Sequence, residues 1–391
     1  MKEYKIAKGW AIFIYITAPL LIGLFGWLLI LPFSDGDFSP SATWIFIPIS
    51  LGMITLMVLG LIETINGKVV IDNEKIYTIS PFSNRQLNFN QIKGYRLIEK
   101  YIIIEPISSD KKRIKISSYY GKSNEIILWL ASNYSDLDLQ NEQQEQEEIL
   151  LNEEFGRTIE ERDEKLKKAR KTAKLINWSG GIVAAFTIFW ADPYEYSILA
   201  SLAMPLVAII VMKFSGGLLR IDERKESAYP SILYGILAPS CALVLRALID
   251  YDIFDYTNVW LPSLLITTFL LGVILIGNKE FKFKKAMDYF TLFGAAMFLF
   301  GFSFGSLITL NCYYDNSKPE IYNAKILDKR ISSGKSRTCY FEITPWGKRT
   351  EKEEVSVSKR LYNSLDKDDE VNIYFRTGKF NIPWFTVREK E

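Results

Sequence analysis

The chain has 391 residues and a formal net charge of +2, so its length allows two or three folding units and its charge balance does not indicate nucleic acid as a partner. It contains no histidine, which excludes Ser-His-Asp triads, Cys-His pairs, histidine-ligated metals and phosphohistidine relays. The three cysteines, Cys241, Cys312 and Cys339, are too few and too scattered for a zinc ribbon or an iron–sulfur site. We therefore expect no metal and no cofactor.

Apolar runs of bilayer length recur along the chain, and a bilayer core needs about 20 such residues per helix. Seven runs approach that length: 9–31, 43–62, 175–191, 196–212, 231–249, 259–277 and 289–310. The third is the weakest, because it is short and carries Asn177, Ser179, Gly180 and Gly181. The first is too long for the apolar region of a signal peptide, and no small-residue cleavage site follows it. The sequence thus predicts an α-helical integral membrane protein with about seven transmembrane helices.

Charges in the loops predict the orientation of these helices, since basic residues resist translocation. Loops 32–42, 192–195 and 250–255 carry acidic residues, among them Asp35 and Asp37, and no base. The remaining loops and the N-terminus are rich in lysine and arginine, including Lys279, Lys282, Lys284 and Lys285. This alternation places the N-terminus inside and the C-terminus outside. Losing runs three and four together would preserve that topology, whereas losing one alone would not.

Residues 66–139, between the second and third runs, have the pattern of a small cytoplasmic β domain. Apolar segments 69–71 and 76–79 flank a polar turn, which is typical of a hairpin. Further strand candidates cover 95–98, 101–104 and 114–117, and a helix is predicted over 124–133 with Ile127, Trp129 and Leu130 as packing residues. Strands closed by one C-terminal amphipathic helix follow the order of a pleckstrin-homology-like (PH-like) domain, and this stretch resembles such domains in bacterial membrane proteins.

Two further segments complete the domain organisation, which is 1–65, 66–139, 140–174, 175–311 and 312–391. Residues 140–174 are acidic first and basic last, and pairs such as Glu161 with Lys165 and Glu164 with Lys168 favour one charged helix. We interpret it as a solvated connector rather than a partner-binding coil. Residues 312–391, outside by the charge rule, predict a second small β domain with strands near 321–331, 339–343, 355–357, 371–375 and 380–387.

This order of segments resembles a group of uncharacterised bacterial multi-pass membrane proteins with a PH-like insert and a short β tail. The resemblance extends to Pro345-Trp346-Gly347 and Ile382-Pro383-Trp384. It implies a place in the bacterial cytoplasmic membrane, but it implies no activity and no functional residue.

Few residues are candidates for chemistry. Arg246 lies about one turn inside the outer end of the fifth run, with Asp250 four residues later as its natural partner, and charged residues inside a membrane are often functional. A snorkelling arginine at the interface explains the same position. Prolines interrupt four runs at Pro19, Pro48, Pro205 and Pro239, which could open carbonyls toward a cavity, although proline is common in such helices.

Two surface features complete the candidates. Lys111, Lys112 and Arg113 form a basic run that fits either a solvated hairpin tip or a contact with anionic lipid head groups. Cys312 and Cys339 would both face an oxidising compartment, where a disulfide is one outcome and two unrelated buried thiols are the other.

These observations favour a non-enzymatic membrane protein that acts as a scaffold, senses the envelope or assembles a complex with a protein partner that the sequence does not identify. The alternative is a transporter or channel built around Arg246 and proline-broken helices. An enzyme acting on lipid ranks third, because no nucleophile and base can be named.

Overall fold

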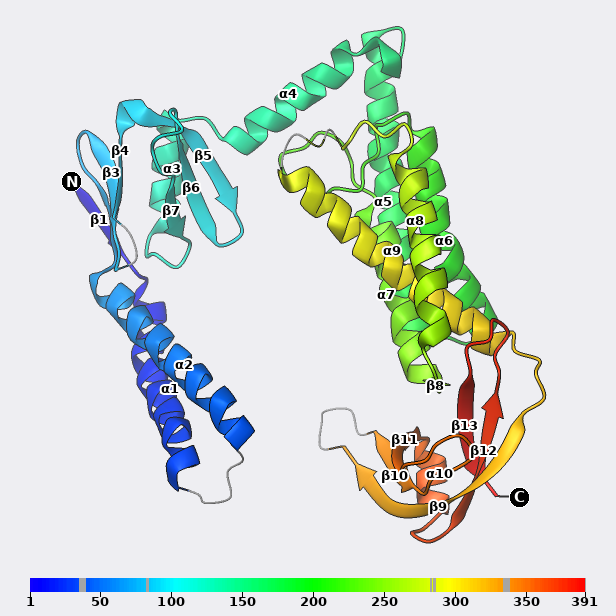
Figure 1. Ribbon diagram of the computed structural model, residues 1–391. Coiled ribbons are helices and arrows are strands. Elements are labelled where there is room, and N and C mark those ends of the chain that lie inside the picture. The colour runs from blue at the N-terminus through cyan, green and yellow to red at the C-terminus, as the bar shows by residue number, and fades with distance from the viewer. Residues whose placement is uncertain (35–39, 82–83, 282, 284–285, 333–337, 391) are drawn as a thin grey trace. The chain divides into compact units, whose positions relative to one another are not determined.

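The computed structural model describes residues 1–34, 40–81, 84–281, 283, 286–332 and 338–390, whose helices and strands are drawn in Figure 1. The chain forms two compact units. The first comprises residues 1–147 with 225–228, and the second comprises residues 148–224 with 229–391. Asp35, Asp37, Lys282, Lys284 and Lys285, which contribute to the predicted orientation, lie outside the described residues.

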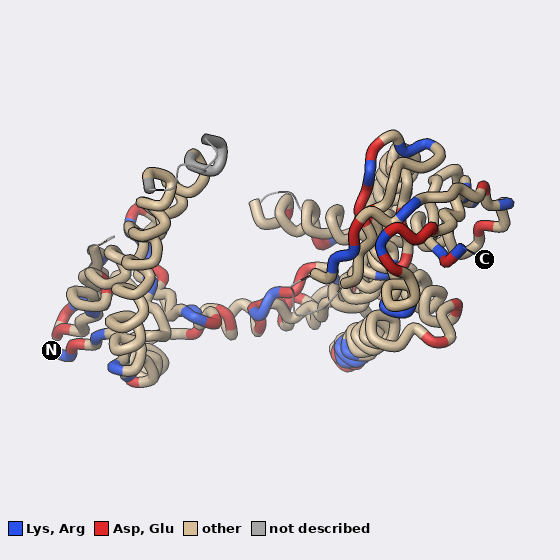
Figure 2. Tube along the Cα trace, turned by 90° about the horizontal axis from the view of Figure 1, so that it is seen from below, with Lys and Arg blue, Asp and Glu red and all other residues tan. Residues whose placement is uncertain are grey.

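A hairpin of two apolar helices begins the first unit. Helix α1 (Lys8–Ser34) packs against α2 (Pro40–Asn66), and their tubes are almost entirely uncharged in Figure 2. Their outward faces expose large apolar side chains such as Trp27 and Ile30, as lipid-facing helices do. Strand β1 (Lys2–Lys5) precedes α1 and pairs with β2 (Lys68–Ile71), which follows α2. The N-terminus and the β domain therefore lie at the same end of the hairpin.

The β domain of the first unit consists of two antiparallel sheets and a helix. The order β1-β2-β3-β4 includes β3 (Lys75–Ile79) and β4 (Arg85–Asn88), and β5 (Ile92–Ile98), β6 (Tyr101–Pro106) and β7 (Ile114–Ser117) form the other sheet. Helix α3 (Ser123–Asn133) buries Ile126 and Leu130 against this core. The predicted strands and helix are confirmed. Strands β1 and β4 were not predicted, because each is short and polar with one buried side chain, Tyr4 or Leu87.

The predicted single helix over 140–174 is wrong, because the chain turns at residues 152–158. Helix α4 (Leu137–Leu151) is followed by a short 3-10 turn (Glu153–Phe155), and α5 (Ile159–Phe189) begins after Thr158. Thr158 Oγ1 accepts from Glu161 N at 3.2 Å, which caps α5. The buried Arg162 donates to the carbonyls of Gly156 and Leu150, both at 2.8 Å, and holds the turn. The Glu161–Lys165 pair forms at 2.9 Å, and Lys167 pairs with Asp163 at 2.6 Å.

The helices of the second unit form a bundle in which successive helices run in opposite directions (Figure 1). They are α5, α6 (Tyr194–Phe214), α7 (Leu233–Asp250), α8 (Thr257–Leu275) and α9 (Ala286–Tyr313). In the described part of the chain, six helices are long and apolar enough to cross a membrane: α1, α2, α6, α7, α8 and α9. The third predicted run is the second half of α5, which is not among them. The chain is thus a multi-pass membrane protein by its helices, with six spans identified.

Asn177 and Gly180 of α5 face the start of α7. Asn177 Nδ2 donates to Ser231 O at 2.8 Å, and Asn177 Oδ1 accepts from Gly235 N at 2.9 Å. A Cβ at Gly180 would lie 2.7 Å from Gly235 Cα, so only glycine permits this close approach of the two backbones. Near the other end of α7, Arg246 contacts Thr187 O. The second half of α5 therefore runs beside α7 for most of the length of α7.

The C-terminal β domain is one sheet with the order β11-β10-β9-β12-β13-β8. Its strands are β8 (Asp252–Ile253), β9 (Glu320–Ile331), β10 (Cys339–Ile343), β11 (Glu353–Val357), β12 (Glu370–Arg376) and β13 (Trp384–Glu389), with α10 (Lys359–Ser364) against β10. Its core includes Ile326, Phe341 and Ile373. The predicted strands are confirmed, except that 380–383 precede β13. Strand β8 was not predicted, because it lies in the loop between α7 and α8.

Candidate functional site

Arg246 lies near the C-terminal end of α7 and joins α7 to the last turn of α5. Its Nη1 lies 3.3 Å from Asp250 Oδ1, so the structure brings the two predicted residues together. Its Nε donates to Thr187 O at 2.7 Å and its Nη2 to Ile188 O at 3.1 Å. These carbonyls belong to the last turn of α5, where carbonyl groups have no N–H partner within the helix. Each of the three guanidinium nitrogens thus has a structural partner, which favours an anchoring role.

The four prolines noted in the sequence do not break their helices. Helices α1, α2, α6 and α7 continue through Pro19, Pro48, Pro205 and Pro239. Pro205 and Pro239 are buried in the bundle, where neighbouring helices cover the altered turn. The idea of proline-broken helices is therefore wrong.

A polar junction joins the end of α9 to the C-terminal β domain. Asn311, fully buried, donates from Nδ2 to Ile382 O at 2.9 Å and accepts on Oδ1 from Phe380 N at 2.8 Å. Asp315 Oδ2 accepts from Trp384 Nε1 at 2.8 Å and from Gly378 N at 3.1 Å. Burial opposes ionisation of Asp315, but hydrogen bonds from Ser317 N, Trp384 Nε1 and Gly378 N outweigh it and lower the pKa of the carboxyl group. We call Asn311, Asp315, Gly378, Ile382 and Trp384 the α9 junction.

A second attachment comes from the loop between α7 and α8. Strand β8 pairs with β13, and Phe254 N donates to Pro383 O at 2.8 Å. The Phe254 ring packs edge-on against Trp346 and Phe375, and the Arg349 guanidinium lies 4.3 Å from its centroid. Arg349 also donates to Phe254 O at 3.1 Å. The β domain therefore holds the bundle at two places.

Asp252, in β8, is a half-buried acidic group that pairs with Phe385 of β13. Burial raises the pKa of its carboxyl group to about 6, and the charge of Glu353 adds to the shift. Glu353 itself accepts from Trp346 Nε1 at 2.7 Å and pairs with Arg349. A carboxylate with a raised pKa beside a second acid makes this attachment sensitive to pH.

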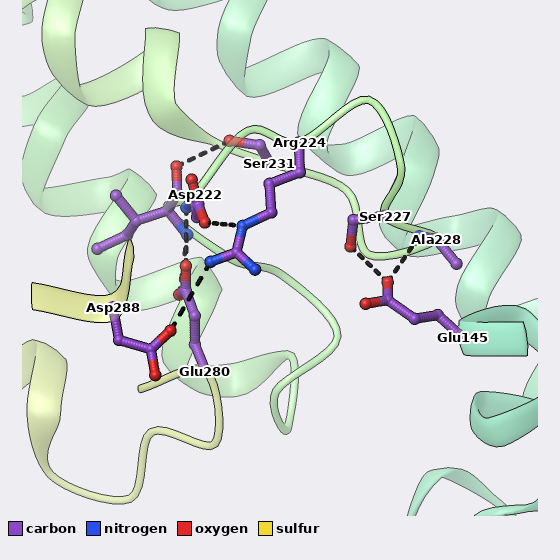
Figure 3. A network of polar contacts seen from close by, with 9 residues as sticks. Glu145, Asp222, Arg224, Ser227, Ala228, Ser231, Glu280 and Asp288 are labelled. Atoms are coloured by element: carbon purple, nitrogen blue, oxygen red, sulfur yellow. Dashed lines mark hydrogen bonds and ion pairs between the residues drawn. The ribbon is translucent and has the colours of Figure 1, made fainter. Parts of the chain in front are cut away.

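At the other end of the bundle, the loop before α7 meets the loop before α9 (Figure 3). Glu280 accepts from Asp222 N at 2.8 Å and from Ile221 N at 3.1 Å, and burial raises the pKa of its carboxyl group. Arg224 contacts Asp222 and lies 3.9 Å from Asp288. The network ties these two loops together. In the first unit, Glu145 accepts from Ser227 Oγ at 2.6 Å.

The first unit has its own polar pocket, of about 380 Å³, between its two sheets and the end of α2. Glu63 accepts there from Ser80 Oγ at 2.7 Å and from Tyr120 OH at 3.1 Å. Burial and the Glu63 charge raise the pKa of the Tyr120 phenol. Glu63 thus fastens α2 to the β domain.

The basic run Lys111-Lys112-Arg113 occupies the turn between β6 and β7. Arg113 lies 3.9 Å from Glu105, and its carbonyl accepts from Arg85 Nη1 at 2.7 Å. The opposite end of β7 leads to Tyr119, whose carbonyl accepts from Ala7 N beside α1. The run is therefore at the end of β7 away from helix α1, a position that suits a solvated turn.

The three cysteines are free thiols in the structure. Cys312 is buried at the end of α9 beside Ile253 and Ile382, whereas Cys339 pairs with Ile331 at the far end of the twelve-residue strand β9. At about 3.3 Å per residue, that strand keeps its two ends far apart. A disulfide needs Cα atoms within about 7 Å, so the bridge between Cys312 and Cys339 is not formed.

Sequence reasoning missed most of the residues at the α9 junction. Asn311 offered a signal, since a polar residue at the end of an apolar run is costly unless it has partners. Trp346 and Trp384 were noted only through the resemblance to other multi-pass proteins, and both now lie where the β domain meets the bundle.

No group of three or more acidic or cysteine side chains that could hold a metal occurs among the described residues. No protein-family model, curated protein or solved structure matches this chain. The resemblance to bacterial multi-pass proteins with a PH-like insert thus depends on the order of elements and on the two tryptophan motifs.

Proposed function

We propose that this chain is a non-enzymatic protein of the bacterial cytoplasmic membrane that links a cytoplasmic PH-like domain to an extracytoplasmic β domain. In this proposal it serves as a scaffold, an envelope sensor or an assembly factor for a partner complex. Two sheets followed by one helix, α3, support the PH-like assignment.

The observation that carries this proposal is the attachment of the C-terminal β domain to the bundle by buried polar contacts. Asn311 and Asp315 of the α9 junction, together with strand β8, attach the domain to three helices of the bundle. A ligand or partner that displaces such a domain would also displace α9 and the α7–α8 loop. Moving the domain alone would break buried hydrogen bonds, which is energetically costly. A flexibly tethered domain could not pass on such a displacement.

Seven spans are part of the proposal, with the second half of α5 as the additional one. Through the contacts of Asn177 and Arg246, this half of α5 runs beside α7 along most of its length, and α7 is long and apolar enough to span a membrane. The face of α5 away from α7 exposes Trp178, Ile182 and Phe189, which suit lipid. An odd number of spans places the two termini on opposite sides.

Photo-crosslinking in intact cells tests the proposed role. A photoreactive residue at Ser356 would probe the exposed edge strand β11, which could accept a partner strand. The matched control places the same photoreactive residue in the position of Trp178, on the apolar face of α5. We expect Ser356 to yield a defined protein adduct that also co-purifies in mild detergent. Adducts no different from those at Trp178 would contradict a partner-binding role for this edge.

A further inference from the structure

A groove of about 290 Å³ lies between α5 and α6 at the end of the bundle opposite the C-terminal β domain. One side is basic and the other is apolar. Its lining includes Lys165, Lys168 and Thr172 of α5, Val211 and Phe214 of α6, and Leu218. Such a combination matches an amphipathic ligand with an anionic head and a hydrocarbon tail.

The basic side of the groove retains positive charge. Lys165 has Glu161 as a partner at 2.9 Å, but Lys168 has no carboxylate at ion-pair distance among the described residues. The carboxylate of Asp163 pairs instead with Lys167, which is not part of the groove lining. An anion in the groove would therefore meet at least one lysine that is not neutralised.

The apolar side of the groove is open to the surroundings of the bundle. Phe214, the last residue of α6, is 88% exposed, although it ends one of the apolar helices. Beside it, Lys213 Nζ donates to Ile274 O at 2.9 Å, near the end of α8. Two membrane-spanning helices thus end at this level, which is where phospholipid head groups lie.

We propose that this groove binds an anionic phospholipid of the cytoplasmic leaflet, with its phosphate between Lys165 and Lys168 and an acyl chain along Val211 and Phe214. This inference depends on the seven-span topology proposed above, which places the groove on the cytoplasmic side. The lipid would fix the position at which the charged half of α5 enters the membrane.

The test uses the full-length protein in mild detergent, titrated with phosphatidylglycerol and read by native mass spectrometry and by thermal stability. The double variant Lys165→Gln/Lys168→Gln is expected to weaken lipid retention roughly 5- to 30-fold. This loss corresponds to the attraction of two lysine charges for one phosphate. The matched control, Lys167→Gln/Lys171→Gln, removes the same charge from exposed positions outside the groove lining and should retain the lipid. Equal retention by both double variants would overturn the proposal.

A second variant keeps the proposal testable if the double variant unfolds. Thr172→Phe fills the groove without changing a charge, and it should displace the lipid while the helical signal is unchanged. Soluble glycerol phosphate should not substitute for the lipid, because it lacks the chain that contacts Phe214. Stabilisation by glycerol phosphate equal to that by phosphatidylglycerol would overturn a lipid site. Labelling of a cysteine at position 171 in cells reports the topology separately, so its failure is distinguishable from failure of lipid binding.

Discussion

Trp384 donates its indole N–H to Asp315 Oδ2 at 2.8 Å, across 69 residues of sequence, and so joins the last strand of the chain to the end of α9. The Trp384 ring also packs edge-on against Tyr251 from the loop after α7. One side chain therefore touches both attachments of the β domain. Its hydrogen bond to a carboxylate is of the stronger kind.

Replacing Trp384 by Phe removes this hydrogen bond and keeps an aromatic ring. We expect the β domain to loosen from the bundle by about 1.5–3 kcal/mol, because the Asp315 carboxylate loses a donor. Limited proteolysis in detergent should then cut more rapidly at residues 314–319. Trp178→Phe, at an exposed position of α5, is the control and should leave cleavage unchanged. Equal cleavage of the two variants would contradict the role of the junction.

Arg246→Leu should lower the thermal stability of the protein in detergent, by about 3 kcal/mol. The change leaves Asp250 without its cation and the carbonyls of Thr187 and Ile188 without a donor. Arg246→Lys retains the charge and should be milder, although its single ammonium cannot reproduce the planar fork.

Solute uptake separates the two interpretations of Arg246. An anchoring arginine predicts reduced stability and, where the protein still folds, no change in transport of any solute. Unchanged stability together with altered uptake would instead support a transporter that uses this residue.

Asp252 should make the stability of the β domain depend on pH. The folded state holds the proton more tightly than the unfolded chain, since burial raises the pKa from 3.8 to about 6. The stabilisation from this group is therefore complete below about pH 4 and is lost as the pH rises through 6, with a total of up to about 3 kcal/mol. Asp252→Asn should raise the melting temperature at pH 7.5 and change it little at pH 4.

Asp255 provides a control of the opposite sign. Hydrogen bonds from Thr257 Oγ1, at 2.6 Å, and Thr257 N lower the pKa of this carboxyl group at the start of α8. Its stabilisation is present above the unfolded pKa and is lost as the pH falls through the folded pKa. Asp255→Asn should thus lower the melting temperature at pH 7.5. The same response from both variants would rule out the proposed environment of Asp252.

The sequence predicted those elements whose pattern is local. Apolar runs indicated α1, α2 and α6 to α9, and alternating apolar residues indicated most strands. The turn before α5 also had a local signal, Thr158 followed by Glu161, which is a helix-capping pattern that the charge pattern obscured.

The contacts of the candidate sites could not be predicted in this way. Asn311 meets Ile382, and β8 meets β13, only because the C-terminal chain returns to the bundle, and no local pattern encodes that return. Likewise, Asn177 and Gly180 weakened the third predicted span, whereas their role is to allow close packing against α7. The Arg246–Asp250 pair could be predicted because its members lie four positions apart on one helix and so share a face.

Cys312 and Cys339 should both react with an alkylating agent under denaturing conditions without prior reduction. The structure holds them as free thiols in separate surroundings, with β9 between them. Peptide mapping without reductant should recover the two alkylated peptides separately. A linked peptide pair would require a different path of the chain between α9 and β10.

The topology itself gives the most general prediction, because it distinguishes six spans from seven. If the second half of α5 crosses the membrane beside α7, a cysteine at Lys112 should be protected from impermeant reagents and a reporter fused to the C-terminus should be active outside. The contact of Arg246 with Thr187 makes this expectation specific, since an α5 that lay on the membrane surface could not reach the C-terminal end of α7. A second cysteine, at Tyr196 near the start of α6, should be labelled from outside. A cytoplasmic signal from the C-terminal reporter would leave only six spans and would place both β domains on the same side of the membrane.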